Sequence, residues 1–87
     1  MTLNKGDQVR NVCQEAAETF RKLNSPEYSG IISRLEFCVG SYDFDQNPVG
    51  LFEHAKIAFK MLEEIKKSKP RKVNKKLLDD LLKYSSE

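Results

Sequence analysis

Apolar residues recur every three or four positions in four segments of this 87-residue sequence, and prolines separate these segments. Such spacing places the apolar residues of one segment on one face of an α-helix. Proline suits the first turn of a helix and disrupts a helix interior, so each proline marks a boundary. The sequence therefore predicts an all-α fold, a compact bundle of four short helices over about residues 7–24, 26–42, 48–67 and 74–85.

Each expected helix has a residue near its start that suits a helix N-terminus. Asp, Ser and Asn side chains accept hydrogen bonds from the first backbone amides of a helix, which have no partner inside it. The candidate N-cap residues are Asp7, Ser25, Asn47 and Asn74. Val73 precedes the last of these and Leu78 follows it by four residues, which is the spacing of a hydrophobic staple.

The second segment also permits a β-strand, because Leu35, Phe37 and Val39 alternate along the chain. Seven apolar residues at helical spacing outnumber these three, and an isolated strand would lack a pairing partner. We therefore expect a helix with Gly40 near its end. A turn-rich connector over residues 42–47 should follow it.

The third helix has the widest apolar face, an arc of roughly 220° that includes Ile57. A face this wide usually contacts two neighbours, so we expect the third helix to be central. Short connectors favour antiparallel neighbours and therefore an up-down arrangement. The residues expected on the buried face of the fourth helix are Leu77, Leu78, Leu81, Leu82 and Tyr84.

The length of the chain suits one helical domain over residues 1–87. No apolar run approaches the roughly 18 residues of a membrane span, and the first residues lack the order of a secretory signal, so we expect a cytoplasmic protein. Cys13 and Cys38 lie on apolar helical faces and form no recognised zinc pattern. We expect both to be reduced thiols packed in the core.

Asp43, Asp45 and Asn47 have the spacing that opens an EF-hand calcium loop. Pro48 occupies the position where that loop needs glycine, and His54 occupies the position of its last acidic ligand. We therefore prefer an interpretation in which these residues cap the third helix, and a divalent-cation site is the weaker hypothesis.

The only histidine, His54, falls inside the apolar arc, where we expect a packed side chain with one hydrogen-bonded nitrogen. The sequence has no glycine-rich phosphate loop, serine elbow or cluster of metal ligands. We therefore expect a non-enzymatic protein with no cofactor, no metal and no small-molecule substrate.

Positive charge is concentrated in residues 66–76, which contain seven basic residues and no acid. Because the whole chain has a net charge of +2, the rest of it carries −5. These basic residues are Lys66, Lys67, Lys69, Arg71, Lys72, Lys75 and Lys76. They could neutralise nucleic-acid phosphates, or they could simply be a solvated surface, since no aromatic residue accompanies them for base stacking.

Phe37 points about 180° away from the apolar stripe of its own helix, and Phe44 would project nearby if that helix continued. Two neighbouring phenylalanines suggest a patch, which Met1 and Leu3, the basic connector or another chain could cover. Our leading hypothesis is an interaction module that binds a protein partner or itself through Phe37 and Phe44. The alternative is a nucleic-acid-binding accessory protein that uses the basic segment.

Overall fold

A computed structural model describes the backbone of residues 5–85 and the side chains of residues 6–84. The described chain is helical and contains no strand, which confirms the all-α prediction. Its elements are α1 (Lys5–Leu23), the short 3₁₀ turn η1 (Pro26–Tyr28), α2 (Ser29–Asp45), α3 (Val49–Ser68) and α4 (Lys75–Ser85).

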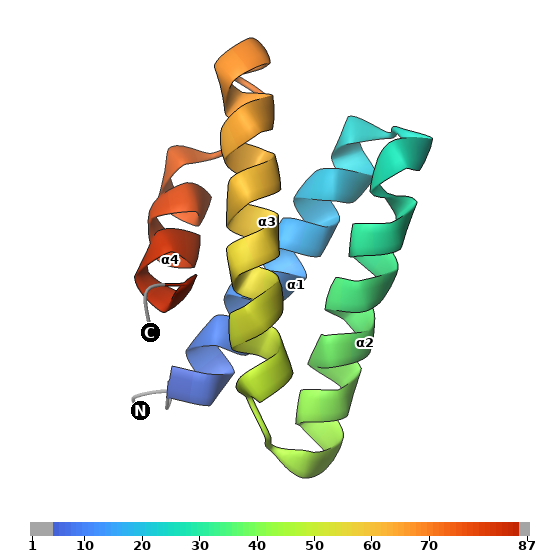
Figure 1. The fold of residues 1–87 in the computed structure, drawn as a ribbon, viewed down its shortest axis with the longest axis vertical. Helices are drawn as coiled ribbons and strands as arrows, with labels where there is room; N and C mark the ends of the chain where they lie inside the picture. Colours follow the sequence, from blue (N-terminus) through green and yellow to red (C-terminus); the bar gives the residue numbers. More distant parts are fainter. Residues whose placement is uncertain (1–4, 86–87) are drawn as a thin grey trace.

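The four helices run up and down in turn, with α3 in the middle (Figure 1). α2 and α4 lie on either side of α3, and α1 crosses behind it at an angle. α3 packs against all three other helices, as expected for the central helix. α1 also packs against all three, so the bundle has two central helices.

The core is one continuous cluster with contributions from every α-helix. Its largest fully buried side chains are Phe20, Leu35, Leu51, Leu62, Leu77 and Leu81. Ala16 and Ala17 of α1 and Ala55 and Ala58 of α3 are also fully buried. Because alanine adds little bulk, a neighbouring helix can approach closely at each of these positions.

The expected N-cap at Asn74 is confirmed, whereas Asn47 lies one residue before Pro48, the N-cap residue of α3. The side-chain oxygen of Asn47 accepts a hydrogen bond of 3.2 Å from the Val49 amide, and that of Asn74 accepts one of 2.8 Å from the Lys76 amide. Val73 and Leu78, the expected staple residues, are both buried.

The prediction for Ser25 is only partly right, and the position predicted for Asp7 is wrong. Ser25 is the N-cap residue of η1, but its side chain makes no capping hydrogen bond, and Pro26 opens the 3₁₀ turn rather than α2. Asp7 lies inside the first turn of α1, and its carboxylate accepts a hydrogen bond of 2.8 Å from the Tyr42 hydroxyl. The acid therefore joins α1 to α2.

The expected connector after Tyr42 is also wrong, because α2 continues to Asp45. Gly40 consequently lies well inside the helix. The helix ends where Gln46 adopts a left-handed conformation with φ of 61°, and the Gln46 amide donates to the Tyr42 carbonyl. Tyr42 is buried and hydrogen-bonded to α1, and a Cβ at Gly6 would lie only 2.5 Å from the Tyr42 hydroxyl oxygen. We attribute the longer helix to this contact with α1, which outweighs the local turn preference.

Two residues expected on buried faces are exposed. Ile57 of α3 is 40% exposed and Leu82 of α4 is 51% exposed. The four helices cover only part of each wide apolar face, so residues at the margins of a face remain in contact with solvent.

Truncating a central core residue should test this arrangement. Leu62 of α3 is fully buried, so Leu62→Ala should lower the free energy of unfolding by about 2–5 kcal/mol, measured by urea denaturation. Lys60→Ala on the exposed side of the same helix should change it by less than about 0.5 kcal/mol. If the two substitutions lowered the free energy of unfolding equally, the face of α3 that contains Leu62 would not be the buried one.

Candidate interaction surface on the second helix

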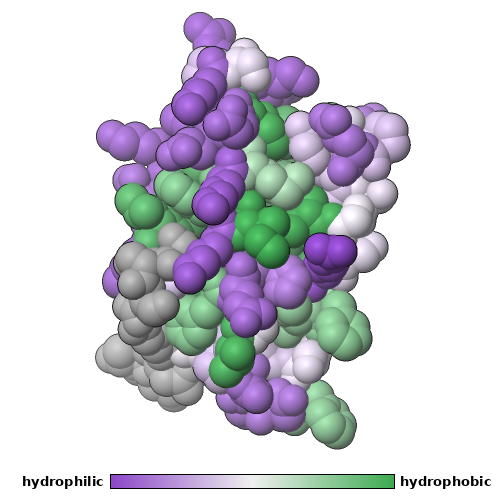
Figure 2. All heavy atoms as spheres, viewed as in Figure 1, coloured by the Kyte–Doolittle hydropathy of each residue, from purple (hydrophilic) through white to green (hydrophobic). Residues whose placement is uncertain are grey.

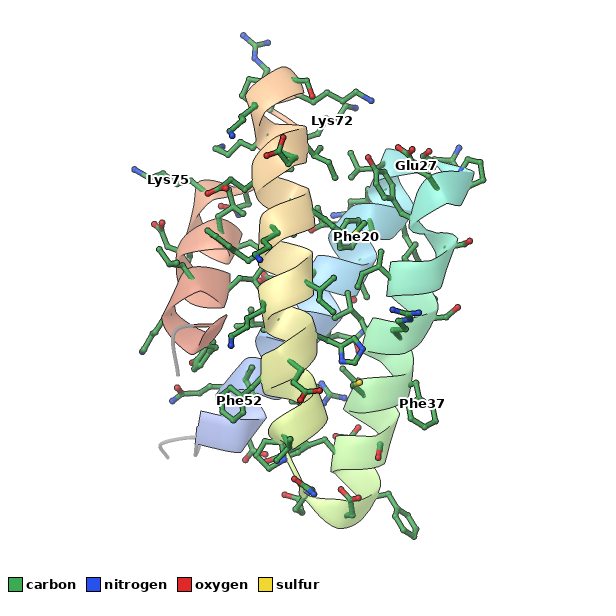
Figure 3. The ribbon with its side chains drawn as sticks, in the orientation of Figure 1. Phe20, Glu27, Phe37, Phe52, Lys72 and Lys75 are labelled. Atoms are coloured by element: carbon green, nitrogen blue, oxygen red, sulfur yellow. The ribbon has the colours of Figure 1, made fainter. Side chains whose placement is uncertain are left out.

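Phe37 and Phe44 are the most exposed large apolar residues that the structure describes. Phe37 is 76% exposed and Phe44 is 92% exposed. They are seven residues apart in α2, which places them on the same side of the helix about 10 Å apart along its axis. Phe37 points away from the bundle (Figure 3). The sequence-based prediction of an outward phenylalanine pair is therefore confirmed.

The two rings belong to a wider surface with almost no charge. We define the outer face of α2 as the residues within about 60° of Phe37 around the helix axis. These residues are Gly30, Ser33, Arg34, Phe37, Gly40, Ser41 and Phe44, and all are exposed. Arg34 is the only charged residue among them.

The exteriors of the other helices are rich in charge. Their exposed charged residues include Glu15, Glu18, Arg21 and Lys22 on α1, Glu53, Lys56, Lys60, Glu63, Glu64 and Lys67 on α3, and Lys75, Lys76, Asp79 and Lys83 on α4. Figure 2 shows hydrophilic residues over the upper part of the molecule and apolar ones at the lower right edge, where α2 lies in Figure 1. The outer face of α2 is therefore chemically distinct.

Contacts with α1 hold α2 in place on one flank. The Arg10 guanidinium donates two hydrogen bonds, of 3.1 and 3.0 Å, to the Asp43 carboxylate, and Arg21 pairs with Glu36. The hydrogen bonds from Arg10 lower the pKa of Asp43 below its usual value. The hydrogen bond to Asp7 raises the pKa of Tyr42, and burial raises it further. These contacts join one flank of α2 to α1, and the outer face lies next to that flank.

The other flank of the outer face borders a hollow of about 160 Å³ between α2 and the start of α3. Its lining residues are Phe37, Cys38, Ser41, Asp45, Asn47, Gly50 and Leu51. Asp45 is its only acidic residue, and one oxygen of that carboxylate accepts a hydrogen bond of 2.9 Å from the Asn47 amide. The hollow is thus lined by an aromatic ring and by one carboxylate, eight residues apart on α2.

The three residues that resemble the opening of a calcium loop do not converge on one point. Asp43 pairs with Arg10, Asp45 accepts from the Asn47 backbone, and the Asn47 side chain accepts from the Val49 amide. Within residues 5–85, no three His, Cys, Asp or Glu residues are grouped as a metal site would require. The capping interpretation of Asn47 is confirmed in part, and the arrangement adds no support to a divalent-cation site.

His54 is half-buried beside Cys38, as expected for a packed histidine with one bonded nitrogen. Its Nδ1 lies 2.8 Å from the Gly50 carbonyl oxygen and 3.3 Å from the Cys38 sulfur. Burial and the nearby Glu53 carboxylate raise the pKa of Cys38 above its usual value. A thiol with a raised pKa is mostly protonated near neutral pH, so this pair lacks the thiolate that a nucleophilic cysteine needs.

The two cysteines are both free thiols, and they differ in burial. Cys13 is fully buried in the core, where burial raises its pKa to about 12, whereas Cys38 is half-buried. The prediction of a core thiol is confirmed for Cys13 and only partly for Cys38.

The basic segment does not form one continuous surface. The Lys66 ammonium donates to the Pro70 and Val73 carbonyls at 3.3 and 3.1 Å, and thus supports the connector between α3 and α4. Lys67 pairs with Glu64 at 3.4 Å. Lys72 and Lys75 lie on opposite sides of the upper end of α3 (Figure 3).

Two further basic residues share their surroundings with acids. Arg71 and Lys72 line a hollow of about 620 Å³ together with Glu15 and Glu18 of α1. These carboxylates offset part of the positive potential that the sequence suggested. Lys69, Lys75 and Lys76 are exposed and do not line this hollow.

Sequence reasoning identified Phe37 and Phe44 but missed the rest of the outer face. Arg34, Ser41 and Asp45 gain their significance from lying beside the two rings and the hollow. The remaining residues could have been found from the sequence, because their helical spacing places them opposite the apolar stripe. They were missed because α2 was expected to end before Phe44. Met1 and Leu3, the expected covers of the patch, lie outside the described residues.

Comparison with models of known protein families, with curated proteins and with solved structures gave no match to this chain. Among the helices described over residues 5–85, none is both long and apolar enough to cross a membrane. The outer face of α2 therefore has to be interpreted from its own chemistry.

The ion pair between Arg10 and Asp43 should make stability depend on pH. Because the folded-state pKa of Asp43 is lowered, its contribution is present above the unfolded pKa of about 4 and is lost as pH falls through the folded value. Asp43→Asn should melt at a lower temperature than the wild type at neutral pH, and the difference should shrink below about pH 4. Circular dichroism melts at several pH values would measure this, with Asp79→Asn as the control. A difference that stays constant down to about pH 2 would contradict the assignment.

Proposed function

We propose that this protein is a non-enzymatic interaction module that binds a protein partner through the outer face of α2. The observation that carries the proposal is the pair of exposed phenylalanines on one nearly uncharged side of a helix. Burying an exposed aromatic side chain is worth about 1.5–3 kcal/mol, so two rings on one face can supply much of the energy of a weak complex.

The amphipathic pattern of α2 supports the proposal. Its inner face contributes Ile31, Leu35, Val39 and Tyr42 to the core, and its outer face carries two further aromatic rings. A helix that is apolar on opposite sides is usually packed on both sides. In this chain the inner side is packed by α1 and α3, and the outer side has no neighbour within the described residues.

Three residues of the outer face are of types enriched at interface centres. Aromatic residues and arginine are enriched there, while lysine and acidic residues are depleted. Phe37, Phe44 and Arg34 are residues of the enriched types. Because α1 supports α2 through two ion pairs, little ordering would be needed on binding. The free thiols fit a reducing compartment, and we include a cytoplasmic location in the proposal.

Replacing both rings should separate binding from folding. The double variant Phe37→Ser/Phe44→Ser should keep its free energy of unfolding within about 0.5 kcal/mol of the wild type, since both side chains are exposed. A photo-crosslinker introduced at Ser41 should couple the wild-type chain to a protein partner, and the double variant should lose that product. Ile57→Ser, an exposed apolar position on α3, should retain it.

A drop in stability of more than about 1 kcal/mol in the double variant would mean that the rings are covered by the chain itself. Loss of crosslinking in the Ile57→Ser control as well would show that the effect is not specific to the outer face. Either result would contradict the proposal.

Nucleic-acid binding is the second candidate function, favoured by the exposed Lys69, Lys75 and Lys76 and by the position of the last two at the start of α4. It predicts binding to duplex or single-stranded DNA that weakens steeply with salt. Charge reversal of Arg71, Lys72, Lys75 and Lys76 should lower the affinity by at least about tenfold, measured by fluorescence titration at two salt concentrations. Reversal of Lys56 and Lys60 on α3 is the matched control. Binding that survives the first set of reversals would remove this candidate.

A further inference from the structure

We infer that the partner of the outer face of α2 is a second copy of this chain, bound with the two α2 helices antiparallel around a two-fold axis. The inference rests on the proposed function, because it requires that the outer face be a binding surface. The observations that lead to it are the order of residues along that face and the charge on one of its flanks.

The order of residues along the face is suited to pairing with itself. Gly40 and Ser41 lie midway between Phe37 and Phe44. If the two-fold axis passes between these small residues, each Phe37 lies at the level of Phe44 of the partner subunit. The two helices can approach closely at the axis, because glycine has no Cβ and a Cβ built at Gly40 would meet nothing within 4 Å. The four rings would then flank a narrow central contact.

The same axis brings opposite charges together. Arg34 and Asp45 lie on the same flank of α2, the one that borders the hollow beside α3. Two-fold symmetry places Arg34 of one chain opposite Asp45 of the partner subunit, with an offset of two residues or about 3 Å along the axis. The pair occurs twice in the dimer. An interface between like faces is isologous, so it needs this kind of self-complementarity.

The electrostatic surroundings of Arg34 support this pairing. Arg10 and Arg21 both have carboxylate partners on the neighbouring helix. Arg34 is exposed, and no partner for its guanidinium occurs within residues 5–85. Asp45 lines the hollow together with Asn47. One Asp45 oxygen accepts from the Asn47 amide, and the Asn47 side-chain oxygen accepts from the Val49 amide. The guanidinium of a second copy would enter at the level of these oxygens and could donate to them.

The contact area is sufficient for a weak dimer. Four phenylalanine rings bury about 150 Å² each, roughly 600 Å² in total. The small residues and the two arginines would bring the buried surface to about 1,000 Å², which is the lower limit for a specific interface. We therefore expect a dimer that dissociates on dilution, with a Kd in the micromolar range or above.

A charge-swap experiment on the full chain tests the inference. In sedimentation equilibrium, the wild type should dimerise, and Arg34→Asp and Asp45→Arg should each weaken dimerisation by at least about tenfold, because each places like charges together twice. A mixture of the two variants should form a heterodimer. In it, position 34 of each chain again faces a residue of opposite charge at position 45 of the other. The doubly substituted chain should dimerise for the same reason. Arg71→Asp, at an exposed arginine on the connector, should leave dimerisation unchanged.

Each alternative result overturns a definite part of the inference. A wild-type chain that remains monomeric at millimolar concentration would remove the second copy as the partner. The proposed function would then still be judged by the crosslinking of the two-phenylalanine variant. Dimerisation that persists in Phe37→Ser/Phe44→Ser would show that another face is used. Suppose that Phe37→Ser/Phe44→Ser abolishes dimerisation, but that mixing Arg34→Asp with Asp45→Arg does not restore it. The antiparallel register would then be wrong.

Discussion

The structure depends on the central position of α1 and α3, because each of these helices packs against all the others. Both contribute fully buried residues to the single core, among them Phe20 of α1 and Leu62 of α3. Because one central pair supports both outer helices, α2 and α4 each use only part of their surface for the fold.

For α4 the remaining surface is mostly charged, whereas for α2 it is aromatic and nearly neutral. The α1 contacts through Arg10, Arg21 and Asp7 hold α2 firmly, so its exposed rings are not the product of a loosely packed helix. Exposed aromatic residues give nothing to the stability of an isolated chain in water. Their presence on a helix that is packed on its inner side is the basis of the binding role that we propose.

The positive charge that is concentrated along the sequence is not concentrated on one surface of the fold. Along the chain, residues 66–76 are its most conspicuous feature. In three dimensions Lys66 supports a loop, Lys67 pairs with Glu64, and Arg71 and Lys72 lie near acids of α1. A local run of charge says little about surface potential until the neighbouring elements are placed. Arg34 proves more informative, because no partner for its guanidinium occurs within residues 5–85 and the rest of the outer face of α2 is uncharged.

The sequence by itself determined the number and type of helices, most of the core, and the cap at Asn74, because helical periodicity and capping depend on residues close together in the chain. It also indicated that Phe37 points outward. Only the tertiary structure decided where α2 ends, because the contact of Tyr42 with Gly6 and Asp7 spans more than thirty residues. Because α2 extends to Asp45, Phe44 and Asp45 lie on the same helix as Phe37. They complete a surface that sequence spacing alone left incomplete.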